Sequence, residues 1–221
     1  MRVSHVMVAA AIVTTAWVIA PLASTAVVML PDPAVDDALA SSPSRASAVL
    51  AGGCFWGIEE LYQHVRGVTD AVSGYSGGAA RTANYALVSL GTTGHAESVK
   101  ITYDPSQITY GQLLKIFFSV AHDPTQRGGQ GPDTGQQYRS VVFAAGERQQ
   151  QVSQAYIEQL AASHVFKRGI TTQVVPLSAF YAAEDYHQDY ASHHPSQPYI
   201  VMNDLPKVEA LRKLFPQAYM P

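Results

Sequence analysis

The chain has 221 residues, of which 47% are hydrophobic and 14% are charged, and its formal net charge is -3. This length predicts one or two domains, and the composition supplies enough apolar material for a core. No run of more than two Lys or Arg residues occurs, so the sequence lacks the basic patch of a nucleic-acid-binding protein. We therefore expect no nucleic acid among its partners.

The first segment of the chain has the pattern of an export signal. A positively charged start is followed by the apolar run Val6–Ala20, of about 15 residues, and then by small residues. We predict a cleaved signal peptide over residues 1–26 and a periplasmic or secreted protein. The alternative is an uncleaved N-terminal anchor, because the apolar stretch extends to Leu30, and only then would the protein meet a membrane.

The rest of the chain divides into a short linker and one long body. Residues 27–45 are rich in Pro, Ala, Ser and Asp and lack apolar periodicity, which predicts a linker. Residues 46–221 alternate strand and helix patterns, so we predict that they form a single domain.

The body begins with a strand and a helix that meet at the only cysteine of the chain. The run 46–53 is apolar and ends in glycines, which predicts a buried strand, and helical spacing of apolar residues follows Cys54. The later predicted elements are, in order, a strand over 68–78, a half-buried strand over 95–105, a helix opened by a capping box at Thr109 and Gln112, a strand over 138–145, a helix over 147–163 and a strand over 171–177. These elements predict an α+β domain, a two-layer sandwich in which helices pack on a central mixed sheet around a ferredoxin-like core.

The position of Cys54 favours reactivity without proving it. A helix N-terminus carries free N–H groups and the positive end of the dipole, and both stabilise a thiolate. Glu59 and Glu60, which we expect in the first turn, oppose this effect. The alternative is a small buried core residue, since unpaired Cys is among the most buried residue types.

The residues around Cys54 favour a reactive thiol. Gly52 and Gly53 allow the chain to approach a ligand closely. Phe55 and Trp56 add two large apolar side chains beside the thiol, which suits a small apolar group attached to an electrophile.

The motif "GGCFWG" resembles the active-site motif of the A-type peptide methionine sulfoxide reductases. The similarity continues in order through six further blocks: "GYSGG", "NYALV", "GHAESVKITYDP", "HDPTQ", "DTGQQYRSVVF" and "YAAEDYHQDY". It covers residues 48–190, and more loosely the tail. The resemblance implies a catalytic domain that reduces methionine-S-sulfoxide, peptide-bound or free, as protein repair under oxidative stress.

The resemblance implies that Cys54 attacks the sulfoxide sulfur, becoming a sulfenic acid, while Glu97 protonates the oxygen. Strand parity independently places Glu97 on the apolar face with Val99 and Ile101, where burial would keep it protonated. The alternative is a frayed strand end that leaves Glu97 exposed.

The resemblance assigns roles to the other candidate residues. Tyr85 and Tyr138 would hydrogen-bond the sulfoxide oxygen, and Phe55 and Trp56 would hold the methyl group. Asp133, in a glycine-rich loop, would order the site, and His187 and Tyr190 would line the pocket. From the residues alone, the two tyrosines at strand starts are core residues, Asp133 belongs to a turn, and His187 and Tyr190 lie on a polar helix face.

The chain departs from many members of this family because it has no second cysteine to resolve the sulfenic acid. Its tail resembles the one-cysteine branch, which implies an external thiol such as thioredoxin, glutaredoxin or a small thiol. We expect no bound cofactor or metal, oxidised proteins or peptides as substrates, and a monomer.

Two other functions remain open from the residues alone. One is a Cys-His hydrolase or acyltransferase with Cys54 as nucleophile and His95, His122 or His187 as base. The other is a metal-binding module using His187 with the pair His193–His194, although no zinc-type spacing of Cys and His occurs.

Overall fold

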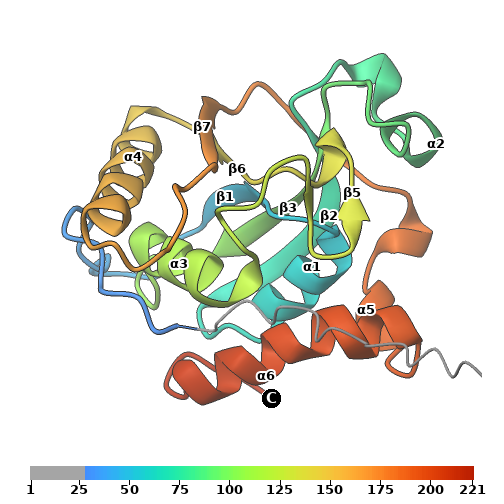
Figure 1. The fold of residues 1–221 in the computed structure, drawn as a ribbon. Coiled ribbons are helices and arrows are strands. Elements are labelled where there is room, and N and C mark those ends of the chain that lie inside the picture. The colour runs from blue at the N-terminus through green and yellow to red at the C-terminus, as the bar shows by residue number, and fades with distance from the viewer. Residues whose placement is uncertain (1–27) are drawn as a thin grey trace, which may run out of the picture.

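The computed structural model describes residues 28–221, so the predicted signal peptide or anchor over 1–26 lies outside the described residues. A six-stranded sheet forms the centre of this part of the chain, in the order β7-β6-β1-β3-β2-β8 (Figure 1). Its strands are β1 (Ala46–Ala51), β2 (Val68–Ser76), β3 (Ala96–Tyr103), β6 (Val141–Ala144), β7 (Gln173–Pro176) and β8 (Phe180–Ala182). Among the helices of residues 28–221, none combines the length and apolarity that a membrane span requires.

The helices pack on this sheet and complete a ferredoxin-like core. They are α1 (Phe55–Gln63), α2 (Tyr85–Val88), α3 (Tyr110–Ile116), α4 (Glu147–Ala162), α5 (Tyr190–His193) and α6 (Leu205–Leu214). The sequence β1-α1-β2-β3-α3-β6 with sheet order β6-β1-β3-β2 is the βαββαβ arrangement of that core. Only the β6–β7 pair is parallel within this sheet, so the predicted mixed sheet and α+β class are confirmed.

The predicted helix start at Thr109 is confirmed, and the structure adds detail to the segments that follow it. The capping box is present, because the Thr109 hydroxyl accepts from the Gln112 N–H and the Gln112 side chain accepts from the Thr109 N–H. The helix it opens continues beyond Ile116 as a π-helical turn, Phe117–Ala121. The glycine-rich loop contains a small hairpin, β4 (Gly129–Gln130) and β5 (Asp133–Thr134).

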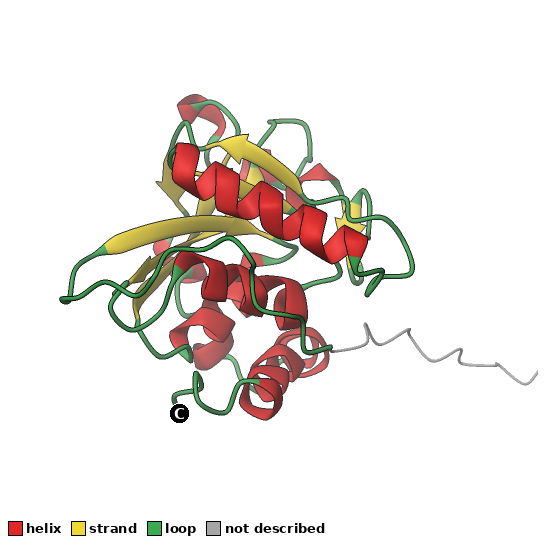
Figure 2. Cartoon of the chain, turned by 90° about the vertical axis from the view of Figure 1, so that its left-hand side faces the viewer, coloured by secondary structure: helices red, strands yellow, loops and turns green. Residues whose placement is uncertain are grey.

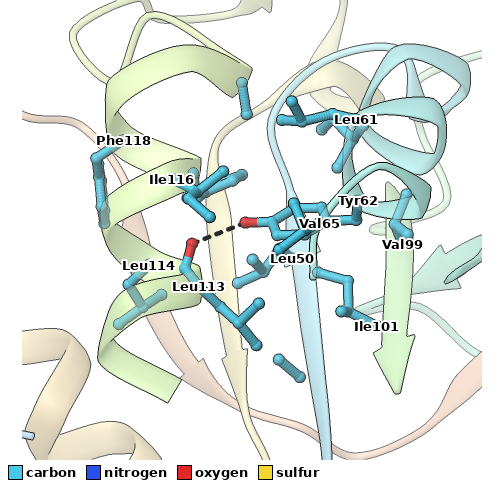
Figure 3. Packing of buried hydrophobic residues seen from close by; sticks show 14 of the residues in the cluster. Leu50, Leu61, Tyr62, Val65, Val99, Ile101, Leu113, Leu114, Ile116 and Phe118 are labelled. Carbon is cyan, nitrogen blue, oxygen red and sulfur yellow. Dashed lines mark hydrogen bonds between the residues drawn. The ribbon is translucent and has the colours of Figure 1, made fainter. Parts of the chain in front are cut away.

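The main core lies between the sheet and helices α1 and α3. Tyr62 of α1 is fully buried and donates a hydrogen bond to the Leu113 carbonyl of α3 at 2.9 Å, which ties the two helices together (Figure 3). Leu50 and Ile101 extend this cluster from β1 and β3. Figure 2 shows helices grouped beneath the strands, near the C-terminus.

The prediction that β3 is half-buried is wrong, because both of its faces are covered. β3 lies between β1 and β2, and Ser98 and Thr102 on its second face are buried. A smaller apolar cluster covers that face and includes Val49, Phe143 and the partly buried Phe180.

Residues 28–45 of the predicted linker contain no helix or strand, yet they pack along α3 and α4. Leu30 is only 1% exposed, and the Tyr156 hydroxyl of α4 donates to the Pro31 carbonyl. Asp36 accepts hydrogen bonds from the start of α3, including the Gly111 N–H at 2.9 Å. This segment therefore joins two helices of the body.

Candidate active site

Cys54 is the N-cap residue of α1 and directly follows the turn that ends β1. Its side chain is 8% exposed. Gly53 adopts a positive φ of 105°, and a Cβ there would lie 2.7 Å from the Gln130 side chain; one at Gly52 would meet His122 at 3.0 Å. These glycines thus accommodate the protein's own side chains, whereas the sequence predicts that they admit a ligand.

Burial raises the pKa of the Cys54 thiol well above its ordinary value. The negative charges of Glu97 and Asp204 raise it further, whereas the Trp56 backbone N–H and Lys207 lower it. The expectation that Glu59 and Glu60 oppose the thiolate from the first turn is wrong, because α1 begins at Phe55 and has no acidic residue in that turn. The resting thiol is protonated.

Glu97 lies on β3 with its carboxyl directed at the start of α1. Its Oε2 accepts a hydrogen bond from the Phe55 N–H at 3.1 Å, one residue from Cys54. The side chain is 2% exposed, which confirms the burial that strand parity predicts. Burial raises the pKa of Glu97 to about 8; the Phe55 N–H lowers it and the charge of Asp133 raises it. Glu97 therefore carries its proton at neutral pH.

Aromatic rings surround Trp56 beside the thiol. The Trp56 indole N–H donates to His187 Nδ1 at 3.2 Å, and its ring stacks on Tyr190 with centroids 3.9 Å apart. The Phe55 ring lies 5.0 Å from His187, which is buried. The alternative of a polar helix face is wrong for His187, because this contact takes its imidazole into the site.

Tyr85 and Tyr138 reach the same site from different elements. Tyr85 is the first residue of the short helix α2, so its expected place at a strand start is wrong, and it is 37% exposed. Tyr138 ends a 3-10 turn just before β6 and is half-buried. Burial, followed by the charges of Glu97 and Cys54 among others, raises the pKa of both phenols. The Tyr85 ring centroid lies 4.7 Å from that of His187, and Tyr138 packs against the core cluster that contains Cys54, so both phenols, which stay protonated, border the site.

Asp133 lies on β5, where the Tyr199 hydroxyl donates to its Oδ2 at 2.5 Å. Burial raises the pKa of Asp133, although the Tyr199 hydrogen bond and Lys207 lower it. Tyr199 also meets Trp56 edge-on, with centroids 6.2 Å apart. The loop aspartate and the tail of the chain thus come together at the aromatic cluster.

Sequence reasoning missed several residues of this site. Glu184 accepts from the Tyr85 N–H and from the Tyr75 hydroxyl, each at 2.9 Å, and so fixes α2 against β2. Asp204 and Lys207 lie against the start of α1. Glu184 stands in a block that resembles the family, but only the folded tail brings Asp204 to Cys54.

The histidines do not support the alternative functions. Within residues 28–221, none of the hydrogen bonds of His95, His122 or His187 involves Cys54. His122 is bonded to Ser140 at 2.7 Å, and burial lowers its pKa to about 4. Within residues 28–221, no group of three or more His, Cys, Asp or Glu residues is arranged to hold a metal ion.

Comparison with known proteins gives one consistent family. Residues 46–219 match the family described as "Peptide methionine sulfoxide reductase". Peptide methionine sulfoxide reductase MsrA 2 of Synechocystis sp. is 54% identical over 189 residues, which is 85% of this chain and 88% of that protein. MsrA 2 of Mesorhizobium japonicum is 54% identical over 179 residues, 81% of this chain and 92% of that protein.

Solved structures of such proteins share the fold. Mxr1 of Saccharomyces cerevisiae in reduced form matches with a TM-score of 0.62 and 31% identity, covering 72% of this chain and 94% of that chain. Methionine sulfoxide reductase A of Corynebacterium diphtheriae matches with a TM-score of 0.60 and 36% identity, covering 71% of this chain and 78% of that chain.

Proposed function

Because this chain belongs to the peptide methionine sulfoxide reductase family and is an enzyme that reduces methionine sulfoxide, we propose that Cys54 is its nucleophile and Glu97 its proton donor. The observation that carries this assignment is the hydrogen bond from the Phe55 N–H to Glu97, which holds a protonated carboxyl one residue from the thiol. We assign the S epimer as substrate, because one enzyme type serves each sulfoxide epimer and the resemblance to the A-type family implies the S epimer.

The first half-reaction transfers oxygen from the substrate to Cys54. The Cys54 sulfur attacks the sulfoxide sulfur while Glu97 gives its proton to the sulfoxide oxygen. Methionine leaves, the oxygen ends on Cys54 as a sulfenic acid, and the thiol proton restores Glu97 through solvent. The substrate sulfur is reduced and the Cys54 sulfur is oxidised by two electrons each.

The surrounding groups orient this reaction. Tyr85 and Tyr138 donate to the sulfoxide oxygen, because their raised pKa values keep the hydroxyls protonated. Phe55 and Trp56 hold the methyl group. His187 and Tyr190 hold the Trp56 indole in place: His187 accepts a hydrogen bond from its N–H, and Tyr190 stacks on its face.

Asp133 serves the site indirectly. Its Oδ2 holds the Tyr199 hydroxyl, and the Tyr199 ring contacts the edge of the indole cluster. Asp133 thus orders the aromatic cluster around Trp56.

The sulfenic acid is resolved by an external thiol in this proposal, because Cys54 is the only cysteine of the chain. Thioredoxin, glutaredoxin or a small thiol supplies it, and no bound cofactor is needed. We propose that the protein is exported by residues 1–26, acts on oxidised proteins or peptides as a monomer, and depends on a dedicated reductant because the periplasm is kept oxidising.

Single-turnover kinetics in thiol-free buffer test the proposal. With a peptide containing methionine-S-sulfoxide, the wild type is expected to form one equivalent of methionine per enzyme, and none with the R epimer. Cys54→Ser should form none, and Glu97→Gln should form it about 10²–10⁴-fold more slowly. Glu60→Gln, which changes a buried carboxyl on α1, serves as control. A full burst in Cys54→Ser would overturn the assignment.

A further inference from the structure

A buried ion pair of the C-terminal segment lies against the start of α1. Asp204 ends the π-helical turn Ile200–Asp204 and is 0% exposed. The Lys207 ammonium, on α6, donates to Asp204 Oδ1 at 2.9 Å. The Lys207 side chain is 18% exposed, so the pair reaches from the interior to solvent.

Gly57 shows how closely this pair approaches the helix that begins at Cys54. A Cβ at Gly57 would lie 2.0 Å from Asp204 Oδ1 and 2.6 Å from Lys207 Nζ. Gly57 is the third residue after Cys54, so the carboxylate rests on the helical turn that carries the thiol. The absence of a side chain at Gly57 is what admits the pair.

The second carboxylate oxygen of Asp204 has no partner. Oδ2 is buried and accepts no hydrogen bond from any residue in 28–221, whereas Oδ1 is held by Lys207. Buried polar atoms are nearly always satisfied, so a free acceptor against the first turn of the helix that begins at Cys54 points to a donor that arrives during the reaction. Besides Lys207, the ionisable groups near Asp204 are Cys54, Asp133 and Tyr199, whose pKa values it raises.

The two half-reactions make different demands on the site. Sulfoxide reduction needs donors to the sulfoxide oxygen, which Glu97, Tyr85 and Tyr138 provide, and the Cys54 proton passes through solvent to Glu97. Resolution of the sulfenic acid needs a proton acceptor, since an attacking thiol reacts as its thiolate.

We propose that Asp204 is the base that accepts the proton of the incoming external thiol, with Lys207 holding the carboxylate in place. This proposal rests on the proposed function and adds a catalytic residue for its second half-reaction.

The step balances without a further reagent. The thiol proton moves to Asp204 Oδ2, and the thiolate sulfur attacks the Cys54 sulfur, forming an S–S bond as the S–O bond breaks. The leaving hydroxide takes a proton from Glu97 and departs as water, and the Asp204 proton returns to Glu97 through solvent. The external thiol is oxidised and the Cys54 sulfenic sulfur is reduced.

The variant Asp204→Asn tests this role with little change of shape. Its side-chain oxygen can still accept from Lys207, but the amide cannot take up a proton. Glu209→Gln, a partly exposed carboxylate on α6, the helix that follows Asp204, is the matched control. The burst of methionine in thiol-free buffer shows for each variant that the site is folded and that the first half-reaction proceeds.

Resolution is then measured with a weakly acidic thiol, β-mercaptoethanol, and a more acidic one, trifluoroethanethiol. Asp204→Asn should keep its burst and resolve about 10²–10⁴-fold more slowly with β-mercaptoethanol. It should approach the wild-type rate with trifluoroethanethiol, because an ionised thiol needs no base. Glu209→Gln should match the wild type with both.

Three outcomes would overturn the role of Asp204: unchanged resolution in Asp204→Asn, equal slowing with both thiols, or loss of its burst while the wild type keeps one. Failure of the proposed function itself is distinguishable, because the wild type would then form no burst.

Discussion

Glu97→Gln is expected to stabilise the protein at alkaline pH while it impairs reduction. The folded state raises the pKa of Glu97 from 4.5 to about 8, so the folded protein binds this proton more tightly than the unfolded chain. The stabilisation is complete below the unfolded pKa and is lost as pH rises from 4.5 to about 8. At 1.36 kcal/mol per pKa unit, this loss approaches about 4 kcal/mol by pH 8. Such a loss is large beside the ~5–15 kcal/mol stability of a typical domain.

Urea denaturation of both proteins at pH 5 and pH 8 measures this effect. Gln is uncharged, so the free energy of unfolding of Glu97→Gln should fall less than that of the wild type over this interval. Glu59, whose pKa burial raises to about 7, titrates in both proteins and cancels in the comparison. An identical pH dependence in the two proteins would show that the pKa of Glu97 is not raised in the folded state, which would contradict this prediction.

Three packing predictions can be checked by the same denaturation measurement. Gly57→Ala should destabilise the protein by about 1–3 kcal/mol, since its Cβ would collide with Asp204; unchanged stability would contradict this contact. Leu30→Ala should lower the free energy of unfolding by about 2–5 kcal/mol, while the folded variant keeps full activity. An unchanged free energy of unfolding would mean that residues 28–45 are not packed. Tyr62→Phe should cost about 0.5–1.5 kcal/mol, because one buried hydrogen bond is lost while the Leu113 carbonyl keeps the Phe117 N–H as a donor, and a neutral result would exclude the Tyr62 hydrogen bond.

Much of the site could be predicted because its signals are local. The glycine turn and the helical spacing place Cys54 at a helix start, and the Thr109 capping box marks another. The period of two along β3 places Glu97 on the core side, since neighbouring side chains of a strand point to opposite faces. Each of these inferences needs only a few consecutive residues.

The remaining features depend on contacts between distant segments. The sequence indicates only that Asp204 and Lys207 are polar residues of the tail. The packing of α6 against α1 is what buries the Asp204 carboxylate beside Gly57. The composition of residues 28–45 predicts a linker, and composition alone does not reveal that Leu30 packs in the core or that Asp36 bonds to the start of α3.

The surroundings of Gly53 and the helix α2 also differ from the sequence prediction because their causes are not local. The close approach at Gly53 is made by Gln130, which follows far along the chain. The helix α2 has only four residues, too few to show a helical period, so Tyr85 could not be placed from its neighbours.

The most direct test of the account is to locate the oxidised sulfur after one turnover. The wild type is incubated with peptide methionine-S-sulfoxide in thiol-free buffer, treated with dimedone, and analysed by peptide mass spectrometry. We expect one equivalent of methionine and one dimedone adduct per enzyme, at Cys54. Formation of methionine with Cys54 unmodified would contradict it.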